Sequence, residues 1–155
     1  MELGDSRSWR AAAALALVVM VGLSPHGWAK ELTIDELKER VTGASPADRP
    51  ALCIEIAERQ EEALGRLYAA GDVDKADAAL ADVAGFSELA RDYAIQSHKH
   101  EKQSEIAIRK MARKLTNLKH SSVREEQRKI QDTIDRLEKI RDDLLAAMFP
   151  NGVKK

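Results

Sequence analysis

The sequence predicts an all-α protein, and three observations support this fold class. Aromatic residues make up only 4% and charged residues 33% of the 155 residues, a composition typical of long helices. Apolar residues recur at intervals of three and four along most of the chain, which is the spacing of one helix face. No segment shows the alternation expected of a strand. The core is therefore expected to consist mainly of Leu, Ile, Val, Met and Ala.

Residues 1–29 have the pattern of a secretory signal peptide. Arg7 and Arg10 precede an apolar run over residues 11–23, and small residues stand three and one positions before an expected cleavage point after Ala29. The alternative is a retained membrane anchor, but a spanning helix needs about 20 apolar residues and this run is shorter. We therefore expect cleavage near Ala29 and a periplasmic or secreted product.

Residues 30–150 are expected to form a single helical domain, followed by a frayed tail over 151–155. Cys53 is the only cysteine of the chain. In an oxidising compartment such a cysteine is either buried or available for an intermolecular disulfide. Because Leu52 and Ile54 flank it on an expected apolar helix face, burial is favoured.

The first helix of the expected domain is short and starts at Thr33, where Glu36 completes a capping box. The second starts at Ser45 or Asp48, since either residue can cap it and a proline follows each. Gly71 is expected to end this second helix in the left-handed conformation. Its apolar face is expected to contain Cys53, Ile56, Ala57, Ala63, Leu64, Leu67 and Tyr68.

The third helix is expected to be long, because residues 73–118 contain no proline and only Gly85 interrupts the helix formers. An unbroken helix is favoured and would run to about 70 Å. The alternative is a bend at the polar stretch SHKHEKQSE, residues 97–105, which would give a compact bundle. One register runs through the whole segment and contains Leu80, Val83, Ser87, Ala90, Ala94, Ser97, Glu101, Ser104, Ile108, Met111, Leu115 and Leu118.

The fourth helix is expected to start at Ser122, with Glu125 completing a second capping box, and to end at the FPNG segment of residues 149–152. Gln127 and Arg141 are polar exceptions in its apolar seam. The fold is thus expected to consist of antiparallel hairpins that share the long third helix. The heptad repeat of the fourth helix contains Val123, Ile130, Leu137 and Leu144.

Residues 64–83 resemble the tetratricopeptide repeat, with Leu64–Gly65 and Tyr68 in the first helix and small or apolar residues in the second. The resemblance covers one hairpin, with Glu61 at the position of the repeat's tryptophan, whereas such arrays need about three copies to bury their faces. We therefore interpret the segment as a close helical packing device.

The whole chain also resembles uncharacterised exported helical proteins of environmental bacteria. The likeness rests on the leader, the PADRPALC segment at residues 46–53, the long charged helix and the DRLEKIRDDLL segment at residues 135–145. It implies export and an all-helical fold. It implies no activity, because such proteins have none assigned.

Charge is unevenly distributed in the expected domain. Residues 30–97 contain 8 Lys and Arg against 15 Asp and Glu, whereas residues 98–120 contain 7 against 2. This basic segment is either neutralised by Glu125, Glu126 and Asp132 across a hairpin or available to lipid headgroups, envelope polymer or an acidic protein. The candidate contacts for such an anionic partner are Lys99, Lys102, Arg109, Lys110, Arg113 and Lys114.

The sequence does not predict a metal site, a cofactor or a catalytic centre. His98 and His100 are two residues apart and would point to opposite sides of a helix, and His98 with Glu101 and Glu105 offers only a weak set of ligands. No nucleophile elbow, phosphate-binding loop or helical metallohydrolase pattern is present. Nucleic acid is not expected as a partner, because no aromatic residue interrupts the basic segment.

Two hypotheses of function follow. The first is an exported, non-catalytic helical protein that acts through protein–protein contacts or as a homodimer, because an extended hairpin would bury only one stripe of each helix. The alternative is an envelope-associated module that binds anionic lipid or polymer through residues 98–120.

Overall fold

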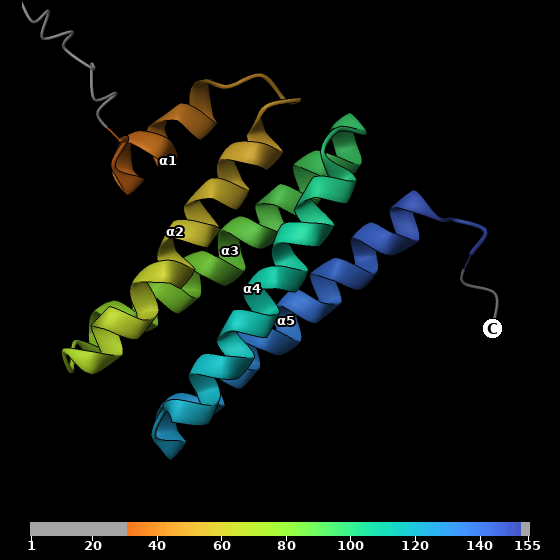
Figure 1. The fold of residues 1–155 in the computed structure, drawn as a ribbon. Helices are drawn as coiled ribbons and strands as arrows, with labels where there is room; N and C mark the ends of the chain where they lie inside the picture. Colours follow the sequence, from red (N-terminus) through yellow and green to blue (C-terminus); the bar gives the residue numbers. More distant parts are fainter. Residues whose placement is uncertain (1–30, 153–155) are drawn as a thin grey trace, which may run out of the picture. The chain divides into compact units, whose positions relative to one another are not determined.

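The computed structural model describes residues 31–152, which are helical and contain no strand, so the all-α prediction is confirmed for this part of the chain (Figure 1). The predicted signal peptide and residues 153–155 lie outside the described residues. The helices are α1 (Ile34–Gly43), α2 (Arg49–Ala69), α3 (Val73–Ser97), α4 (Glu101–Ser121) and α5 (Arg124–Met148).

The helices form two antiparallel hairpins, α2–α3 and α4–α5, which pack on each other (Figure 1). The α3 helix contacts α5 and α4, and α2 also contacts α4, so both hairpins contribute to one core. The short α1 helix lies against α2. The turn between α2 and α3 contains Gly71, whose φ of 74° is the left-handed conformation predicted for it.

The start of α1 is the capping box that the sequence predicts. The Thr33 hydroxyl accepts a hydrogen bond from the Glu36 N–H at 3.2 Å, and Glu36 Oε2 accepts one from the Thr33 N–H at 2.7 Å. The second helix begins after Asp48, the later of its two expected caps, and carries Pro50 in its first turn. The Asp48 carboxylate accepts from the Ser45 hydroxyl at 2.7 Å.

The predicted Ser122–Glu125 capping box of the last helix is wrong by one residue. The Ser122 hydroxyl donates to the Leu118 carbonyl at 2.9 Å and so completes the end of α4. Glu126 instead accepts from the Val123 N–H at 3.3 Å, which makes Val123 the N-cap of α5. As a cap, Val123 is 64% exposed and does not join the apolar repeat to which it was assigned.

The expectation of one unbroken helix over residues 73–118 is wrong. His98 and His100 adopt positive φ angles of 52° and 62° and separate α3 from α4. Histidine enters this left-handed region more readily than most residues, so the chain reverses there without glycine or proline. The reversal lets the two halves of a single apolar register face one core. The register residues that are buried are Leu80, Val83, Ser87, Ala90, Ala94, Ser104, Ile108, Met111 and Leu115.

The core combines small residues on α3 with large residues on the helices around it. Ala90 and Ala94 of α3 are fully buried, as are Ile130, Leu137 and Leu144 of the α5 heptad repeat. Small side chains on a central helix allow its neighbours to approach closely, and large side chains on those neighbours then fill the space.

We predict that Leu137→Ala lowers the free energy of unfolding by about 2–5 kcal/mol, because Leu137 is fully buried and its truncation leaves a cavity. The matched control is Leu89→Ala on α3, where the side chain is 39% exposed and the expected loss is about 0.5 kcal/mol or less. Urea denaturation of the variants measures both values. Equal losses would show that Leu137 does not belong to the core.

Cys53 is buried and free, as the sequence predicts. Burial raises the pKa of its thiol to about 11, although the Arg49 charge acts in the opposite direction. The thiol is therefore protonated at neutral pH in the folded chain. We predict that a thiol reagent at pH 8 labels Cys53 slowly in native protein and rapidly in urea, as followed by mass spectrometry. Equally fast labelling in both states would contradict this burial.

Candidate anion-binding groove

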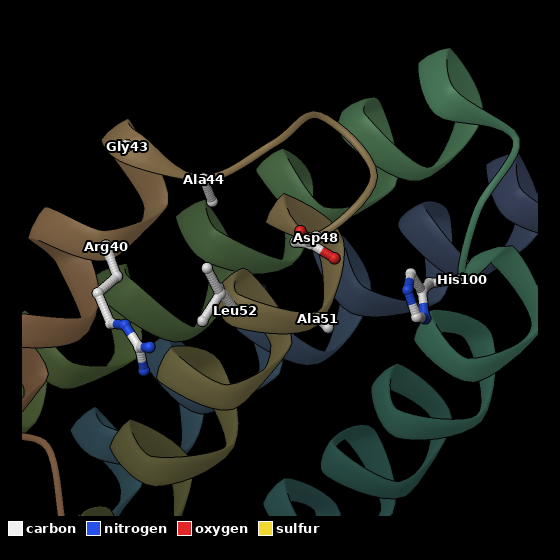
Figure 2. Close-up of a pocket in the computed structure, with 7 residues that line it drawn as sticks. All are labelled: Arg40, Gly43, Ala44, Asp48, Ala51, Leu52 and His100. Carbon is white, nitrogen blue, oxygen red and sulfur yellow. The ribbon is translucent and has the colours of Figure 1, made fainter.

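A shallow depression of about 570 Å³ lies between the α1–α2 connection and the start of α4. Figure 2 shows its charged side chains apart from one another, with Arg40 and His100 at opposite ends. Ala51 and Leu52 of α2 lie between them. Because the charged groups do not converge on one point, this depression does not have the arrangement of a binding site for a charged ligand.

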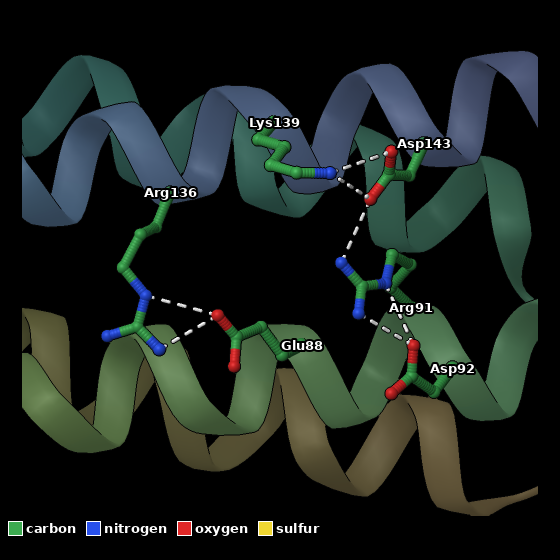
Figure 3. A network of polar contacts seen from close by, with 6 residues as sticks. All are labelled: Glu88, Arg91, Asp92, Arg136, Lys139 and Asp143. Atoms are coloured by element: carbon green, nitrogen blue, oxygen red, sulfur yellow. Dashed lines mark hydrogen bonds and ion pairs between the residues drawn. The ribbon is translucent and has the colours of Figure 1, made fainter.

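Ion pairs join α3 to α5 (Figure 3). Arg136 donates to Glu88 at 2.8 Å, and Arg91 of α3 lies 2.9 Å from Asp143 of α5. At the other end of the same pair of helices, Lys129 lies 2.5 Å from Asp77. Asp77 and Glu88 of α3 are thus matched by cations of α5, Asp82 and Asp92 pair with Lys38 and Arg91, and no acidic residue of α3 forms an ion pair with α4 among residues 31–152.

The α4 helix exposes several cations and no carboxylate. Its two carboxylates are Glu101, whose side chain is largely buried, and Glu105, which is buried. Lys102, Arg109, Lys110 and Arg113 are exposed on α4, and together they are called the basic face below. Lys99 is exposed in the preceding turn. Of the two alternatives for this segment, neutralisation by Glu125, Glu126 and Asp132 is wrong: within residues 31–152 these carboxylates form no ion pair with the six candidate cations.

One edge of the basic face borders a groove of about 200 Å³ between α4 and α5. The fully buried side chains of Ile108 and Leu137 form its floor. Ala112 stands above them, and its single methyl group leaves the space that a longer side chain would fill. Ala112 is thus a small, partly buried residue of the lining that packs against the core.

The walls of the groove carry three arginines. Arg109 and Arg113 are one turn apart on α4 and face Arg141 of α5 across the groove. Glu138 is the one carboxylate in the lining, and no ion pair within the described residues joins it to any of the three arginines. The lining thus contains three positive charges and one negative charge.

These guanidinium groups have few acceptors inside the protein. Arg109 Nε lies 3.5 Å from Glu105 Oε1, and Arg141 Nη2 lies 3.6 Å from Asp142 Oδ1. Arg141 Nε is buried without a hydrogen-bond partner, and Arg113 has no ion pair among residues 31–152. Each guanidinium has five N–H donors, so the groove has more donors than the chain satisfies.

Lys114 differs from the other five candidate contacts, because it crosses to α2. Its ammonium lies 2.9 Å from Glu61 Oε2 and 3.6 Å from Glu62 Oε1. The hydrogen bond to Glu61 raises the pKa of Lys114. Glu61 is only 8% exposed, and its burial raises the pKa of its carboxyl despite the nearby ammonium. Lys114 is therefore a structural partner of α2.

Arg141 is the residue of the groove that the sequence reasoning did not select. The sequence does distinguish Arg141, since this residue is a polar exception in the apolar seam of the last helix. A charged residue at such a position lies at the edge of a helix interface and can reach the neighbouring helix. The sequence does not show that two further arginines of α4 lie beside Arg141, because this depends on how α4 and α5 pack.

The histidines and carboxylates at the start of α4 do not form a metal site. His98 Nδ1 lies 3.6 Å from Glu101 Oε1, whereas Glu105 is directed toward Arg109. Within residues 31–152 no three His, Cys, Asp or Glu side chains are grouped to hold an ion.

We predict that Lys114→Met destabilises the fold by about 1–2 kcal/mol at neutral pH, since it leaves Glu61 buried without its partner; solvent screening of Lys114, 38% exposed, limits the loss. The pKa of Glu61 is already raised in the folded chain, and loss of Lys114 raises it further. The folded state then binds more protons than the unfolded state, so stability falls as pH rises above the ordinary range of a glutamate.

Urea denaturation over a pH series measures this dependence. The exposed neighbour variant Lys110→Met is the control and is expected to match the unmodified chain. The double variant Glu61→Gln, Lys114→Met is expected to lose the added pH dependence. If Lys114→Met and Lys110→Met gave the same pH profile, the coupling of Glu61 with Lys114 would be refuted.

None of the helices in the described part of the chain is long and apolar enough to cross a bilayer. Comparison with protein-family models, with curated proteins and with solved structures finds no match for this chain.

Proposed function

We propose that this chain is an exported, non-catalytic protein that binds an anionic component of the cell envelope through the basic face of α4. The observation that carries the proposal is an exposed helix surface with four cations and no carboxylate. Export is proposed from the leader pattern of residues 1–29.

The pairing of charges supports this choice of surface. Lys38, Lys129 and Arg136 are paired with acidic residues of another helix, whereas the exposed Arg40, Arg66, Arg124 and Arg128 have no ion pair among residues 31–152 but are not gathered on one helix face. Lys102, Lys110 and Arg113 have no ion pair among residues 31–152. Unpaired cations on one side of a helix produce a local positive potential that attracts anionic surfaces. The chain as a whole is close to neutral, so this potential comes from the placement of its charges.

An exposed apolar residue lies within the basic face. Ile106 is 44% exposed and lies one turn from both Lys102 and Lys110 on the same side of α4. Cations around an apolar side chain are a combination that binds the boundary between lipid headgroups and acyl chains. We therefore favour an anionic lipid surface over a soluble acidic polymer.

The structure gives less support for a homodimer than the sequence does. That proposal depended on an apolar seam too extended for one chain to cover. The reversal at residues 98–100 instead places both halves of the seam against the chain's own helices. A dimer then has no stripe of core residues to bury, and the anion-binding hypothesis is the better supported of the two.

We predict that the triple variant Lys99→Gln, Lys102→Gln, Lys110→Gln binds anionic vesicles about a hundredfold more weakly. Each cation near an anionic surface contributes about 1 kcal/mol, so three contribute about 3 kcal/mol. Co-sedimentation with vesicles of equal parts phosphatidylglycerol and phosphatidylcholine measures the affinity, and vesicles of phosphatidylcholine alone measure binding that does not depend on charge.

The matched control is Arg40→Gln, Lys75→Gln, Lys139→Gln, which changes the net charge equally at exposed positions outside α4. This control is expected to bind nearly as well as the unmodified chain, and binding should weaken as salt is added. Equal loss in the two triple variants, or affinity that does not respond to salt, would exclude the basic face as the binding surface.

A further inference from the structure

We propose that the groove between α4 and α5 is a binding site for a phosphate monoester group, held by Arg109, Arg113 and Arg141. This inference rests on the proposed function, because it names the anionic group that the neighbouring basic face would meet. The inference adds a defined site to a general electrostatic attraction by the basic face. The site can be disproved even if the basic face does bind anionic surfaces.

The arginines of the groove favour an anion with more than one negative charge. Three guanidinium groups and Glu138 line the groove, and outside the lining Glu105 and Asp142 lie 3.5 and 3.6 Å from Arg109 and Arg141, so Arg113 is the arginine of the three that has no carboxylate at ion-pair distance among residues 31–152. A phosphate monoester carries a charge of about −1.5 to −2 near neutral pH. Its greater charge is attracted more strongly to the three guanidinium groups than the single charge of a phosphate diester.

The hydrogen-bonding capacity also favours a phosphoryl group over a carboxylate. A carboxylate has two oxygens, which one planar guanidinium can satisfy with a pair of parallel bonds. The terminal phosphoryl group has three oxygens and can accept from several guanidinium groups at once. Arg109 and Arg113 on α4 and Arg141 on α5 provide guanidinium donors from both sides of the groove.

The floor of the groove strengthens these interactions. Ile108 and Leu137 are apolar and fully buried, so they lower the local dielectric beneath the arginines. The space above them depends on Ala112, which separates Arg109 from Arg113 along the helix. Filling that space removes the site without altering any charge, and this makes the proposal separable from general electrostatic binding.

The test uses the full chain with two sources of the same group. Isothermal titration with inorganic phosphate measures binding of the free anion. Co-sedimentation compares vesicles that contain phosphatidic acid, a lipid monoester, with vesicles that contain phosphatidylglycerol, a diester, at equal surface charge. We expect a positive result in at least one of the two measurements. Binding of inorganic phosphate without preference between the vesicles would identify a free phosphate compound as the ligand. Stronger binding to phosphatidic acid vesicles than to phosphatidylglycerol vesicles would identify a lipid headgroup.

Ala112→Leu is the central variant, because leucine keeps the helix and fills the groove. It is expected to lose about tenfold or more in affinity for the monoester, the effect of losing one charge-assisted hydrogen bond. Its binding to phosphatidylglycerol vesicles should be unchanged. Ala146→Leu, at an exposed position of α5 outside the groove, is the matched control.

Glu138→Gln provides a readout that does not depend on filling the groove. It removes the one carboxylate of the lining at an exposed position, so affinity for the monoester should rise. Arg141→Lys keeps the charge but loses the planar fork, so affinity should fall. Unchanged affinity in both of these variants, or no binding of monoester above diester by the unmodified chain, would overturn the site. Binding to phosphatidylglycerol vesicles tests the proposed function instead, and the triple lysine variant measures it independently of the groove.

Discussion

The structure depends on the reversal of the chain at residues 98–100. A single apolar register runs through α3 and α4, and a straight helix would carry its two halves to distant partners. Two left-handed histidines turn the chain so that Ala90 and Ile108, on either side of the break, become buried in one core. The cost of two uncommon backbone conformations is offset by burial of apolar surface on both helices.

The same reversal determines which charges remain unpaired. It brings α5 against α3, where Lys129, Arg136 and Asp143 find partners of opposite charge. It also brings α4 against α2, where Lys114 reaches Glu61. Lys102, Lys110 and Arg113 of α4 form no ion pair among residues 31–152. A chain that is almost neutral in total therefore carries a concentrated positive surface on one helix.

The groove between α4 and α5 follows from the packing of these two helices. Helices in close contact normally fill the space between them, and a small residue at the edge of the contact leaves a hollow. Here the hollow lies over Ile108 and Leu137 and is bordered by arginines from both helices. The structural core and the candidate binding site consequently share two fully buried residues, Ile108 and Leu137.

Much of the fold was available from the sequence, because helix patterns are local. The spacing of Ile130, Leu137 and Leu144 identified a buried face, Thr33 and Glu36 identified a helix start, and the flanks of Cys53 indicated its burial. These features depend on residues within one or two turns of each other. The helical periodicity that predicted them is the same whatever the helix packs against.

Tertiary structure alone decided the break at His98 and His100, the role of Lys114 and the position of Arg141. The polar stretch of residues 97–105 offers a bend as the alternative, but the sequence favours an unbroken helix because the break contains no glycine or proline and the register continues through it. Whether a helix continues or turns there depends on which distant surface can cover its apolar stripe. Likewise, a lysine or arginine becomes a structural partner or a free contact according to what the facing helix presents, and that neighbour is chosen by packing of the whole chain.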